Sequence, residues 1–527
     1  MPNSVDFSGR PFHFIGIGGI GMSAIASILA RRRLPVSGSD VRLNHITQRL
    51  RDQGVHIFLE QAPSNLEFFR PQNGASTCSR RINTYSQVSA PALPAPAAVS
   101  LAEYGVGSIH PMPTEWVGGA SRDDLPQVVC STAIADTNAE YQAALALGCP
   151  ILHRSDVLAA LMQEYRGIAI AGTHGKTTTS SMIGYLLMQA GIDPTIVVGG
   201  EVDAWEGNAR LGDGEYLVAE VDESDGSLVK FSAEIGVITN IELDHPDHYS
   251  SLHEVVTIFQ QFAQRCHHLI ACIDCPGVAK HIQPTISYSV RPGAIADYTV
   301  QQIAYTAQGT TAEVWERGQR LGEMSLKLLG EHNLSNALAA IAVGRFLQIP
   351  FAQIAEILAT FEGARRRFER RGEYHHITFI DDYAHHPSEI QATLAAARLK
   401  AQGSPNGENR RVVAIFQPHR YSRTLAFFKE FSQSFCDADL VITTDIYSAG
   451  EIDLQQVGGA RLAEAIAAHH PAVRYQPTLA RVADCLKQIL KPGDLVLFLG
   501  AGNLNQIIPD LLNFYQQQES LSASLSH

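Results

Sequence analysis

The residues of this chain that could most clearly do chemistry form a glycine-rich turn, Gly172-Thr-His-Gly175, followed by Lys176 and Thr177. An apolar run from Ile168 precedes the turn, and a helix-like segment follows it. In such a turn the backbone N–H groups and the helix N-terminus bind phosphate oxygens, the lysine adds a charge, and the threonine hydroxyl faces a metal ion. Two residues separate the glycines instead of the usual four, because Ile170 stands where the standard pattern has glycine. A chance Gly-Lys-Thr turn would not have this strand and helix around it, so the segment predicts a site for ATP with Mg²⁺.

A second glycine-rich turn, Gly16-Ile-Gly-Gly-Ile-Gly21, lies near the N-terminus between an apolar run and a helix expected from Met22. Asp40 follows the last glycine by nineteen residues. This spacing is typical of dinucleotide-binding folds and, taken alone, predicts NAD. The diphosphate of a nucleotide sugar would contact the same N–H groups. The motif therefore indicates a diphosphate-containing ligand but does not show which one. The glycines also interrupt the uncharged run from Phe12 to Ala30, which argues against a signal or membrane segment.

Two apolar runs in the middle of the chain end in polar clusters, Glu220 to Asp225 and Asn240 to His248. In a parallel sheet both clusters would lie at the edge that carries the phosphate-binding turn, where carboxylates can hold Mg²⁺. His245 is a less expected partner, because that ion prefers oxygen. His245-Pro-Asp-His248 resembles half of a dinuclear zinc site, but the partner histidine pair is missing, which disfavours a metallohydrolase. A solvated acidic loop would explain part of the first cluster but not the placement of both.

The last third of the chain carries basic and histidine-rich strand ends. Five arginines lie between Phe361 and Arg371, and one of them could reach a transferring phosphoryl group from a hinge. The alternative, a nucleic-acid patch, is disfavoured because the chain is acidic. Further apolar runs end at Asp381-Asp-Tyr-Ala-His-His-Pro387, at Phe416 to Thr424 and at Gly500-Ala-Gly-Asn503, which indicates another α/β unit.

Composition bounds the possible functions. The 527 residues predict three or four domains, and 40 basic against 53 acidic residues give a net charge of −13. That balance argues against a non-specific nucleic-acid binder. The eight cysteines are scattered, and Cys272 and Cys275 lack a second pair, so we interpret them as incidental and expect a cytoplasmic protein.

One segment breaks the regular pattern. Residues 61–124 are rich in Pro, Ser, Ala and Gly without a helical or strand period, which predicts a largely disordered insert. Order returns at Leu125 to Cys130, and the polar turn after it can face a ligand. We therefore expect domains at 1–163, 164–364 and 365–515, with a polar, frayed tail at 516–527.

The motifs occur in an order that resembles the Mur ligases: GIGGIGMS, GTHGKTTT, EVDESDGS, NIELDHPDHY, GEHNLSNALAAIA, ARRRFE, DDYAHHP and FQPHRYSRT. The resemblance covers nearly the whole chain except the insert. It implies an α/β protein of three domains: a Rossmann-like N-terminal domain for a UDP-sugar, a P-loop ATPase-like central domain for ATP, and a Rossmann-like C-terminal domain for an amino acid. Gly16 to Ser23 favours the members that add L-alanine to UDP-N-acetylmuramate over the murein peptide recycling ligases, whose first loop usually contains cysteine.

The resemblance also implies roles for individual residues. The UDP-sugar would contact Gly16, Gly18, Gly19, Ile20, Gly21, Met22, Ser39, Asp40, Ser131, Thr132 and Ala133. ATP would contact Gly172, Thr173, His174, Gly175, Lys176, Thr177, Thr178, Asn333, Asn336, Arg367 and Asp382. The metal positions would be Thr177, Glu220 and His245, and the amino-acid side would be lined by Tyr383, His385, Arg420 and Arg423. The implied catalytic set is Lys176, Glu220, His245, Arg367, Asp382 and His385.

The implied reaction explains why cations are needed. A carboxylate must attack the γ-phosphate of ATP, and two negative charges about 4 Å apart repel by roughly 4 kcal/mol at an effective dielectric of about 20. Lys176 and Mg²⁺, which Mn²⁺ could replace, would offset this repulsion. An acyl phosphate would form, the amine of L-alanine would attack it, and His385 would orient that amine or take its proton. Some relatives use a carbamylated lysine about fifteen residues after the position of His245, but this chain has no lysine between Lys230 and Lys280, which excludes that ligand.

Two alternative functions, from other classes of protein, stay open. An NAD-dependent dehydrogenase would explain the first glycine-rich turn and leave the ATP turn unexplained. A non-catalytic nucleotide-binding regulator would leave the clustered histidines and arginines of the last third unexplained. Neither nucleic-acid binding nor membrane insertion is expected.

Overall fold

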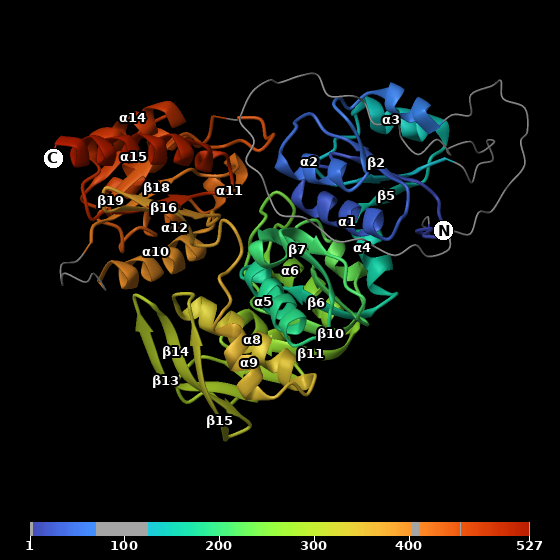
Figure 1. Cartoon of the computed structure of the whole chain (residues 1–527), viewed down its shortest axis with the longest axis horizontal. Helices are drawn as coiled ribbons and strands as arrows, with labels where there is room; N and C mark the ends of the chain where they lie inside the picture. Colours follow the sequence, from blue (N-terminus) through green and yellow to red (C-terminus); the bar gives the residue numbers. More distant parts are fainter. Residues whose placement is uncertain (1–3, 70–124, 403–409, 454, 526–527) are drawn as a thin grey trace, which may run out of the picture.

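The computed structural model of the chain describes residues 4–69, 125–402, 410–453 and 455–525, which form three α/β units (Figure 1). In the view of Figure 1 the central unit lies below and between the other two. Most of the predicted insert, residues 70–124, lies outside the described residues.

The first unit is built on a five-stranded parallel sheet with the order β3-β2-β1-β4-β5. The order reverses between β1 and β4, so the crevice for a ligand opens at their carboxyl ends. Its strands are β1 (Phe12–Ile15), β2 (Val36–Ser39), β3 (His56–Phe58), β4 (Gln127–Cys130) and β5 (Ile151–His153). Its helices are α1 (Ile20–Arg31), α2 (His45–Asp52), η1 (Pro63–Phe69), α3 (Ala139–Leu147) and α4 (Arg154–Met162).

The helix η1 corrects one prediction, because residues 61–69 were expected to belong to the disordered insert. Leu66 is 1% exposed and packs with Cys130 and Ala144. Asn65 donates to the carboxylate of Glu140 at 2.7 Å. The periodicity of the sequence did not predict η1, because tertiary contacts rather than a repeated pattern stabilise this short helix.

The central unit is a ten-stranded sheet with the order β15-β14-β13-β12-β11-β10-β6-β9-β7-β8. The strands from β7 to β13 in this order pair in parallel, whereas β8, β14 and β15 add antiparallel edges. Its strands are β6 (Arg166–Ala171), β7 (Thr195–Val202), β8 (Gly207–Arg210), β9 (Tyr216–Glu220), β10 (Ala233–Ile238), β11 (Cys266–Cys272), β12 (Ile286–Ser289), β13 (Tyr298–Thr306), β14 (Gly309–Glu316) and β15 (Gln319–Leu326). Its helices are α5 (Lys176–Gln189), η3 (Asp203–Trp205), η4 (Ser227–Lys230), α6 (Leu252–Ala263), α7 (Pro276–His281), α8 (Glu331–Phe346) and α9 (Phe351–Leu358).

The third unit is a six-stranded sheet with the order β16-β17-β21-β18-β19-β20, parallel except for β16. Its strands are β16 (Glu369–Tyr374), β17 (Ile377–Asp382), β18 (Val412–Phe416), β19 (Leu440–Thr443), β20 (Val473–Tyr475) and β21 (Leu495–Leu499). Its helices are α10 (Pro387–Gln402), α11 (Tyr421–Ala426), α12 (Phe428–Ser432), α13 (Gly459–Ala467), α14 (Leu479–Ile489), η5 (Leu504–Ile507) and α15 (Ile508–Leu525).

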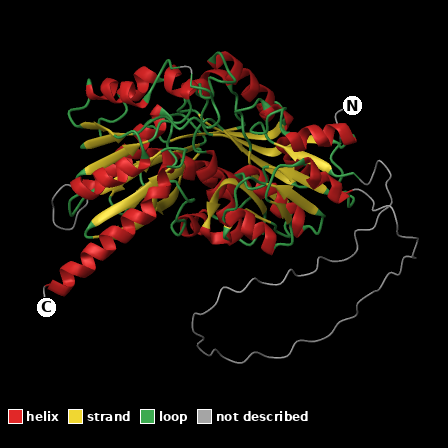
Figure 2. Cartoon of the chain, turned by 90° about the horizontal axis from the view of Figure 1, so that it is seen from above, coloured by secondary structure: helices red, strands yellow, loops and turns green. Residues whose placement is uncertain are grey.

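The C-terminal segment differs from its prediction. Residues from Gln516 were expected to be frayed, but α15 continues as a helix to Leu525 and projects from the body of the molecule in Figure 2. Leu511 and Tyr515 anchor its first turns in the third unit, where both are buried. Within the described residues, no helix has the length and apolarity that a membrane crossing requires.

Candidate active site

The phosphate-binding turn lies at the carboxyl end of β6, between β9 and β10 in the sheet. Gly172 and Gly175 have φ values of 143° and 79°, where a side chain is strained. A Cβ on Gly172 would lie 1.9 Å from the hydroxyl of Thr239, so the turn also excludes side chains by contact. Helix α5 starts directly after Gly175, and its first-turn N–H groups therefore point into the turn.

Lys176 is held over the turn by the backbone and by an acidic residue. Its Nζ donates to the carbonyl of Gly172 at 2.6 Å and to the carboxylate of Glu223 at 2.8 Å. Burial alone would lower the pKa of Lys176, but Glu223 and Asp222 outweigh it and hold that pKa above its ordinary value. The lysine is therefore charged and has its head group fixed where phosphate oxygens would lie. Glu223 was not predicted, although it stands in the quoted EVDESDGS motif.

Of the three predicted metal positions, Thr177 and Glu220 are in contact with each other, whereas His245 contacts another residue. The Thr177 hydroxyl donates to Glu220 at 3.1 Å, and the other Glu220 oxygen accepts from the N–H of Gly199 at 2.7 Å. A hydroxyl beside a carboxylate is an all-oxygen set that suits Mg²⁺ or Mn²⁺. His245 instead faces Asp244, with Nε2 and Oδ2 3.6 Å apart. Burial lowers the pKa of His245, which keeps the ring neutral and able to ligate a metal.

Arg367 crosses from the third unit to the phosphate-binding turn. Its Nη2 donates to the Thr177 hydroxyl at 3.3 Å, and its guanidinium lies 5.3 Å from the ring centre of Tyr383. Asp382 supports this loop from behind, because its carboxylate accepts from the N–H of Phe368 at 2.7 Å. Burial raises the pKa of Asp382 to about 6, although Arg367 lowers it. Asp382 therefore shapes the loop that presents the arginine.

Asn333 and Asn336 lie close to the turn but face inward. The Thr179 hydroxyl donates to Asn336 at 3.0 Å, and Asn333 donates to the carbonyl of Leu329 at 2.9 Å. A Cβ on Gly175 would lie 2.7 Å from the Asn336 oxygen. The Asn336 amide therefore supports the turn from below, and the predicted contact of both asparagines with the base or ribose stays a prediction.

A cavity of about 650 Å³ lies beside these asparagines, between α8 and α10. Glu331, His332 and Ser335 of α8 line it, with Cys272 and Tyr305 on the central sheet. The Tyr305 hydroxyl is buried without a hydrogen-bond partner among the described residues. The cavity has the size and polarity of a nucleotide-base site. Ser335 was not predicted, because the helical period of α8 does not show which of its sides is open.

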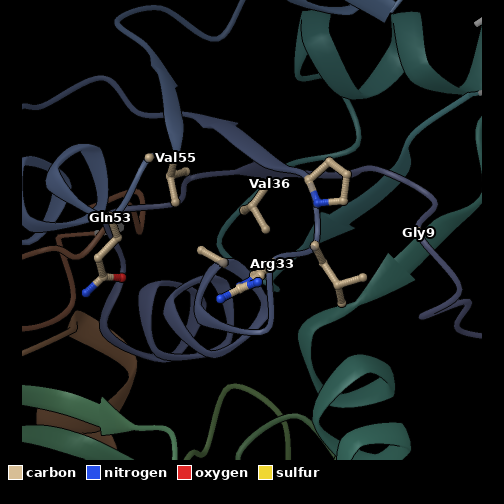
Figure 3. A pocket seen from close by; sticks show the side chains of 9 residues that line it. Gly9, Arg33, Val36, Gln53 and Val55 are labelled. Atoms are coloured by element: carbon tan, nitrogen blue, oxygen red, sulfur yellow. The ribbon is translucent and has the colours of Figure 1, made fainter. Parts of the chain in front are cut away.

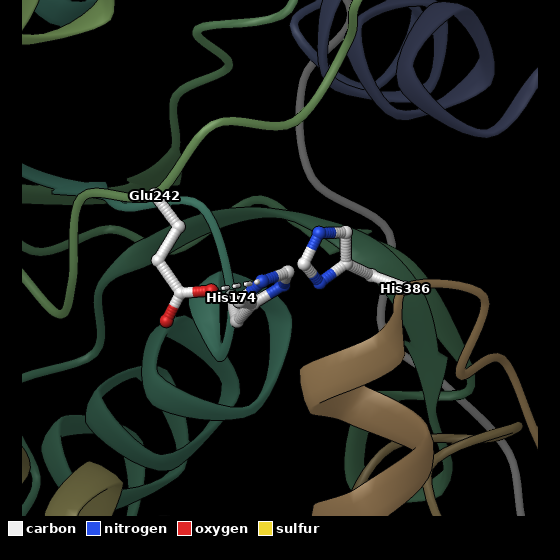
Figure 4. Close-up of side chains that lie close together, drawn as sticks. All are labelled: His174, Glu242 and His386. Carbon is white, nitrogen blue, oxygen red and sulfur yellow. Dashed lines mark ion pairs between the residues drawn. The ribbon is translucent and has the colours of Figure 1, made fainter. Parts of the chain in front are cut away.

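An ion-pair cluster joins the turn to the third unit (Figure 4). His174 Nδ1 lies 3.1 Å from Glu389, and His174 Nε2 lies 3.5 Å from Glu242. The Ser388 hydroxyl donates to Glu242 at 2.9 Å and lies 2.7 Å from Nδ1 of His386. Burial would lower the pKa of His174, but the two carboxylates outweigh it and raise that pKa to about 10. The protonated imidazole and the two carboxylates form a charged clamp between the central and third units. Apart from His174, its members were not predicted: Glu242 and His386 stand in the motifs NIELDH and DDYAHHP, and Ser388 and Glu389 directly follow the second motif.

His385 has the geometry of a proton acceptor. Its Nδ1 lies 2.9 Å from the carbonyl of Tyr383, which can only accept, so Nδ1 carries the hydrogen and Nε2 carries the lone pair. Burial lowers the pKa of His385 to about 4, despite the opposing charge of Glu389. The ring is therefore neutral near pH 7 and can take a proton.

The two arginines predicted for the amino acid are already paired with the central unit. Arg423 Nε donates to Asp244 at 2.8 Å, and the two side chains are 3% and 5% exposed. Arg420 forms a close ion pair with Asp247. An incoming carboxylate must share or displace these aspartates, and the arginine roles stay predictions.

The first glycine-rich turn is shaped by the residues predicted to bind the sugar nucleotide. The N–H groups of Gly16 and Ile17 donate to the carbonyl of Ser39 at 2.8 and 3.0 Å. The N–H of Gly18 donates to the Asp40 carboxylate at 2.8 Å, and the Ser39 hydroxyl is bonded to Glu140. Ser39 and Asp40 therefore hold the turn, which leaves the first-turn N–H groups of α1 for a ligand.

The turn after β4 faces this site across the switch point of the sheet. A Cβ on Gly16 would lie 3.3 Å from Ile134, so the two loops are in contact. Ser131, Thr132 and Ala133 lead into that residue, and the N–H of Ile134 donates to the Ser131 carbonyl at 3.0 Å. The structure thus brings both predicted parts of the sugar-nucleotide site to one sheet edge.

Another cavity, of about 470 Å³, lies elsewhere on the first unit (Figure 3). Gly9, Arg33, Val36, Gln53 and Val55 line it. Gly9, Val36 and Val55 lie at or just before the starts of β1, β2 and β3, and Arg33 and Gln53 follow α1 and α2, so the cavity lies at the sheet edge opposite the glycine-rich turn. It is therefore separate from the site described above.

Known proteins share this architecture. Three family descriptions match in order: "Mur ligase family, catalytic domain" over residues 11–166, "Mur ligase middle domain" over 170–344, and "Mur ligase, glutamate ligase domain" over 366–502. A UDP-N-acetylmuramate–L-alanine ligase of Nostoc punctiforme is 61% identical over 515 residues, covering 98% of each chain. The chain belongs to the Mur ligase family.

Solved structures agree with that assignment. A UDP-N-acetylmuramate-alanine ligase from Thermotoga maritima is 26% identical, with a TM-score of 0.74 over 97% of this chain and 99% of that chain. A murein peptide ligase from Psychrobacter arcticus is 21% identical, with a TM-score of 0.64 over 96% of this chain and 99% of that chain, which shows a shared fold alone. The Mur ligase fold of three α/β units is thereby confirmed, whereas the domain limits stay predictions.

Proposed function

We propose that the chain joins L-alanine to UDP-N-acetylmuramate at the expense of ATP, in peptidoglycan precursor synthesis. The observation that carries this proposal is the meeting of Lys176, Thr177, Glu220 and Arg367 at the turn, in a chain 61% identical to a ligase of that name. A dehydrogenase would leave this assembly without a use. A silent regulator would not need Arg367 brought from another unit.

The residues support an acyl-phosphate route. The turn and Lys176 would hold the ATP phosphates, while the cavity beside α8 would take the base. Thr177 and Glu220, with His245 as the further predicted metal position, would hold Mg²⁺, whose charge would neutralise phosphate oxygens. The substrate carboxylate oxygen attacks the γ-phosphorus and ADP leaves. Arg367 faces the charge that develops on the transferring group.

The second half of the reaction belongs to the third unit. The nitrogen of L-alanine attacks the acyl carbon, the C–O bond to phosphate breaks, and inorganic phosphate leaves with its electron pair. The amine must lose a proton, and Nε2 of His385 would accept it, because Nδ1 of the same ring faces the Tyr383 carbonyl. Tyr383, Arg420 and Arg423 would position the amino acid. Use of ATP and unpaired cysteines at all seven described positions support a cytoplasmic location.

An ADP-release assay with UDP-N-acetylmuramate tests this proposal across L-alanine, glycine, L-serine and a murein tripeptide. L-alanine should give the highest kcat/KM, with Mg²⁺ required and Mn²⁺ able to replace it. Preference for the tripeptide would instead identify a recycling ligase. Absence of ADP release with every acceptor would overturn the ligase proposal.

A further inference from the structure

Arg154, the first residue of α4, lies between the two predicted ligand sites. Its Nη1 is 3.2 Å from the position that a Cβ on Gly21 would occupy. Its Nη2 donates to the Asp222 carboxylate at 2.9 Å, and Asp225 lies 3.8 Å from the same nitrogen. One side of the guanidinium therefore faces the glycine-rich turn of the first unit. The other side faces the acidic loop that continues from Glu220.

The position relative to α1 decides which part of a ligand this cation would meet. Gly21 is the second residue of α1, so the guanidinium lies beside the first turn of this helix. The N–H groups of that turn have no partner within the helix and point toward its N-terminal end. Gly19, the N-cap residue, makes no side-chain cap, and the first turn has no acidic residue. An anion bound at this end of α1 would therefore meet Arg154 as well as the N–H groups.

The side chain is available for such a contact. It is 23% exposed, and Nη1 has no hydrogen-bond partner among the residues that the structure describes. Asp222 and Asp225 occupy the other nitrogen, which fixes the plane of the fork. Arginine forks bind phosphate oxygens through paired N–H groups, which a lysine cannot reproduce. Gly21 makes this approach possible, since a Cβ there would lie 3.2 Å from Nη1 and the guanidinium would have to shift by a few tenths of an ångström.

We infer that Arg154 binds the diphosphate of the UDP-sugar at the N-terminus of α1, as a residue that positions the substrate. This inference rests on the proposed function, because it assumes that the first unit takes a nucleotide diphosphate. Since Asp222 stands two residues after Glu220, the same guanidinium fixes the diphosphate relative to the metal-binding edge of the central unit. Arg154 thereby aims the substrate carboxylate toward ATP. A pure ion pair between units would make no contact with ligand.

Isothermal titration without ATP or metal separates these roles. Arg154→Ala should weaken the binding of UDP and of UDP-N-acetylmuramate by the same factor. The expected loss in affinity is about tenfold to a hundredfold, because a hydrogen bond to a charged group is lost. Arg154→Lys should recover only part of that affinity. Binding of uridine, followed by saturation-transfer NMR, should be unchanged because uridine has no phosphate. A loss confined to UDP-N-acetylmuramate would place Arg154 at the carboxylate and overturn the diphosphate assignment.

Two controls keep the result interpretable. Arg32→Ala removes another arginine of the first unit, 26% exposed and paired with Glu164 at the far end of α1, and should leave UDP affinity within twofold. Asp222→Asn breaks the same ion pair but keeps the guanidinium, and should change UDP affinity less than threefold. Unchanged UDP affinity in Arg154→Ala, or an equal loss of uridine binding, would overturn the inference. Failure of the unmodified protein to bind UDP-N-acetylmuramate would instead overturn the proposed function.

Discussion

The two glycine-rich turns of this chain have the same local form and are completed in different ways. Each follows a buried strand and leads into a helix, β6 into α5 and β1 into α1. The central turn contains its own cation, because Lys176 follows its last glycine directly. The N-terminal turn has no such residue, and a guanidinium reaches it from Arg154, more than a hundred residues later in the chain. A motif in the sequence can thus specify one anion site completely and another only in part.

The carboxylates around the two turns differ as well. At the central turn, Glu223 pairs with Lys176 and fixes a charge that phosphate needs. At the N-terminal turn, Asp40 accepts the N–H of Gly18 and stiffens the loop itself. At the central turn the carboxylate fixes the position of a cation, whereas at the N-terminal turn it fixes the backbone conformation of the loop. Substitutions at the two turns should therefore fail in different ways.

The largest effect is expected at Lys176. Lys176→Ala should lower kcat by about a thousandfold or more, because the fixed cation at the transferring phosphate is lost. Glu223 would stay buried without its partner, so Lys176→Met with Glu223→Gln is the matched variant that removes both charges. Ligation rates and circular dichroism check this. Near-normal turnover in either protein would refute the assignment of the turn.

The next effect concerns the residue that closes the central turn from the third unit. Arg367→Lys should lower kcat about tenfold to a hundredfold with little change in the KM for ATP, since a single ammonium group cannot reproduce the planar fork. Arg370→Lys is the control, because Arg370 is 60% exposed and forms a surface ion pair with Glu373. If Arg367→Lys had the same kcat as the control Arg370→Lys, Arg367 would not be a catalytic residue.

A smaller effect is expected at the N-terminal turn. Gly21→Ala should raise the KM for the UDP-sugar several-fold without changing that for ATP, because its Cβ would crowd Nη1 of Arg154 at 3.2 Å. Gly458→Ala is the control, since a Cβ there meets nothing within 4 Å. Steady-state kinetics with each substrate varied in turn provide the test. A parallel rise in both KM values would point to general disturbance of the fold.

The smallest effect is a dependence of stability on pH at the clamp. His174 has a pKa raised to about 10 in the folded state, so its contribution is fully present below pH 6.5 and is lost as pH rises toward 10. Thermal unfolding should show a Tm that falls by a few degrees between pH 7 and pH 10. The fall should be weaker in His174→Gln. Identical Tm profiles for the two proteins would exclude a protonated clamp.

A change in the opposite direction is expected on the acid side. The pKa values of His385 and His386 are both lowered to about 4, mainly by burial, so these rings are neutral when folded. Their contribution to stability is present above pH 6.5 and is lost as pH falls toward 4. The same Tm series, extended to pH 4, checks this sign.

The sequence alone determined the features that are local in the chain. The strand, turn and helix at Gly172 to Lys176 follow from residue types within about twenty positions, and the structure contains them as predicted. The same holds for the turn at Gly16 to Gly21. Apolar runs ending in polar residues also predicted which strand ends carry functional groups, because parallel strands bring their carboxyl ends to one edge. Motif order was enough to identify the family.

Only the tertiary structure decided which side chains face a ligand and which support others. The period of α8 gave no reason to prefer Ser335 over Asn336, yet one faces the cavity and the other braces the turn. The predicted role of Arg420 and Arg423 was to line the amino-acid side, but aspartates of the central unit form ion pairs with both of them. Arg154 was invisible as a ligand-site residue until folding placed it beside Gly21. In each case the deciding energy is an ion pair or hydrogen bond between residues distant in the chain, and no local pattern encodes such a contact.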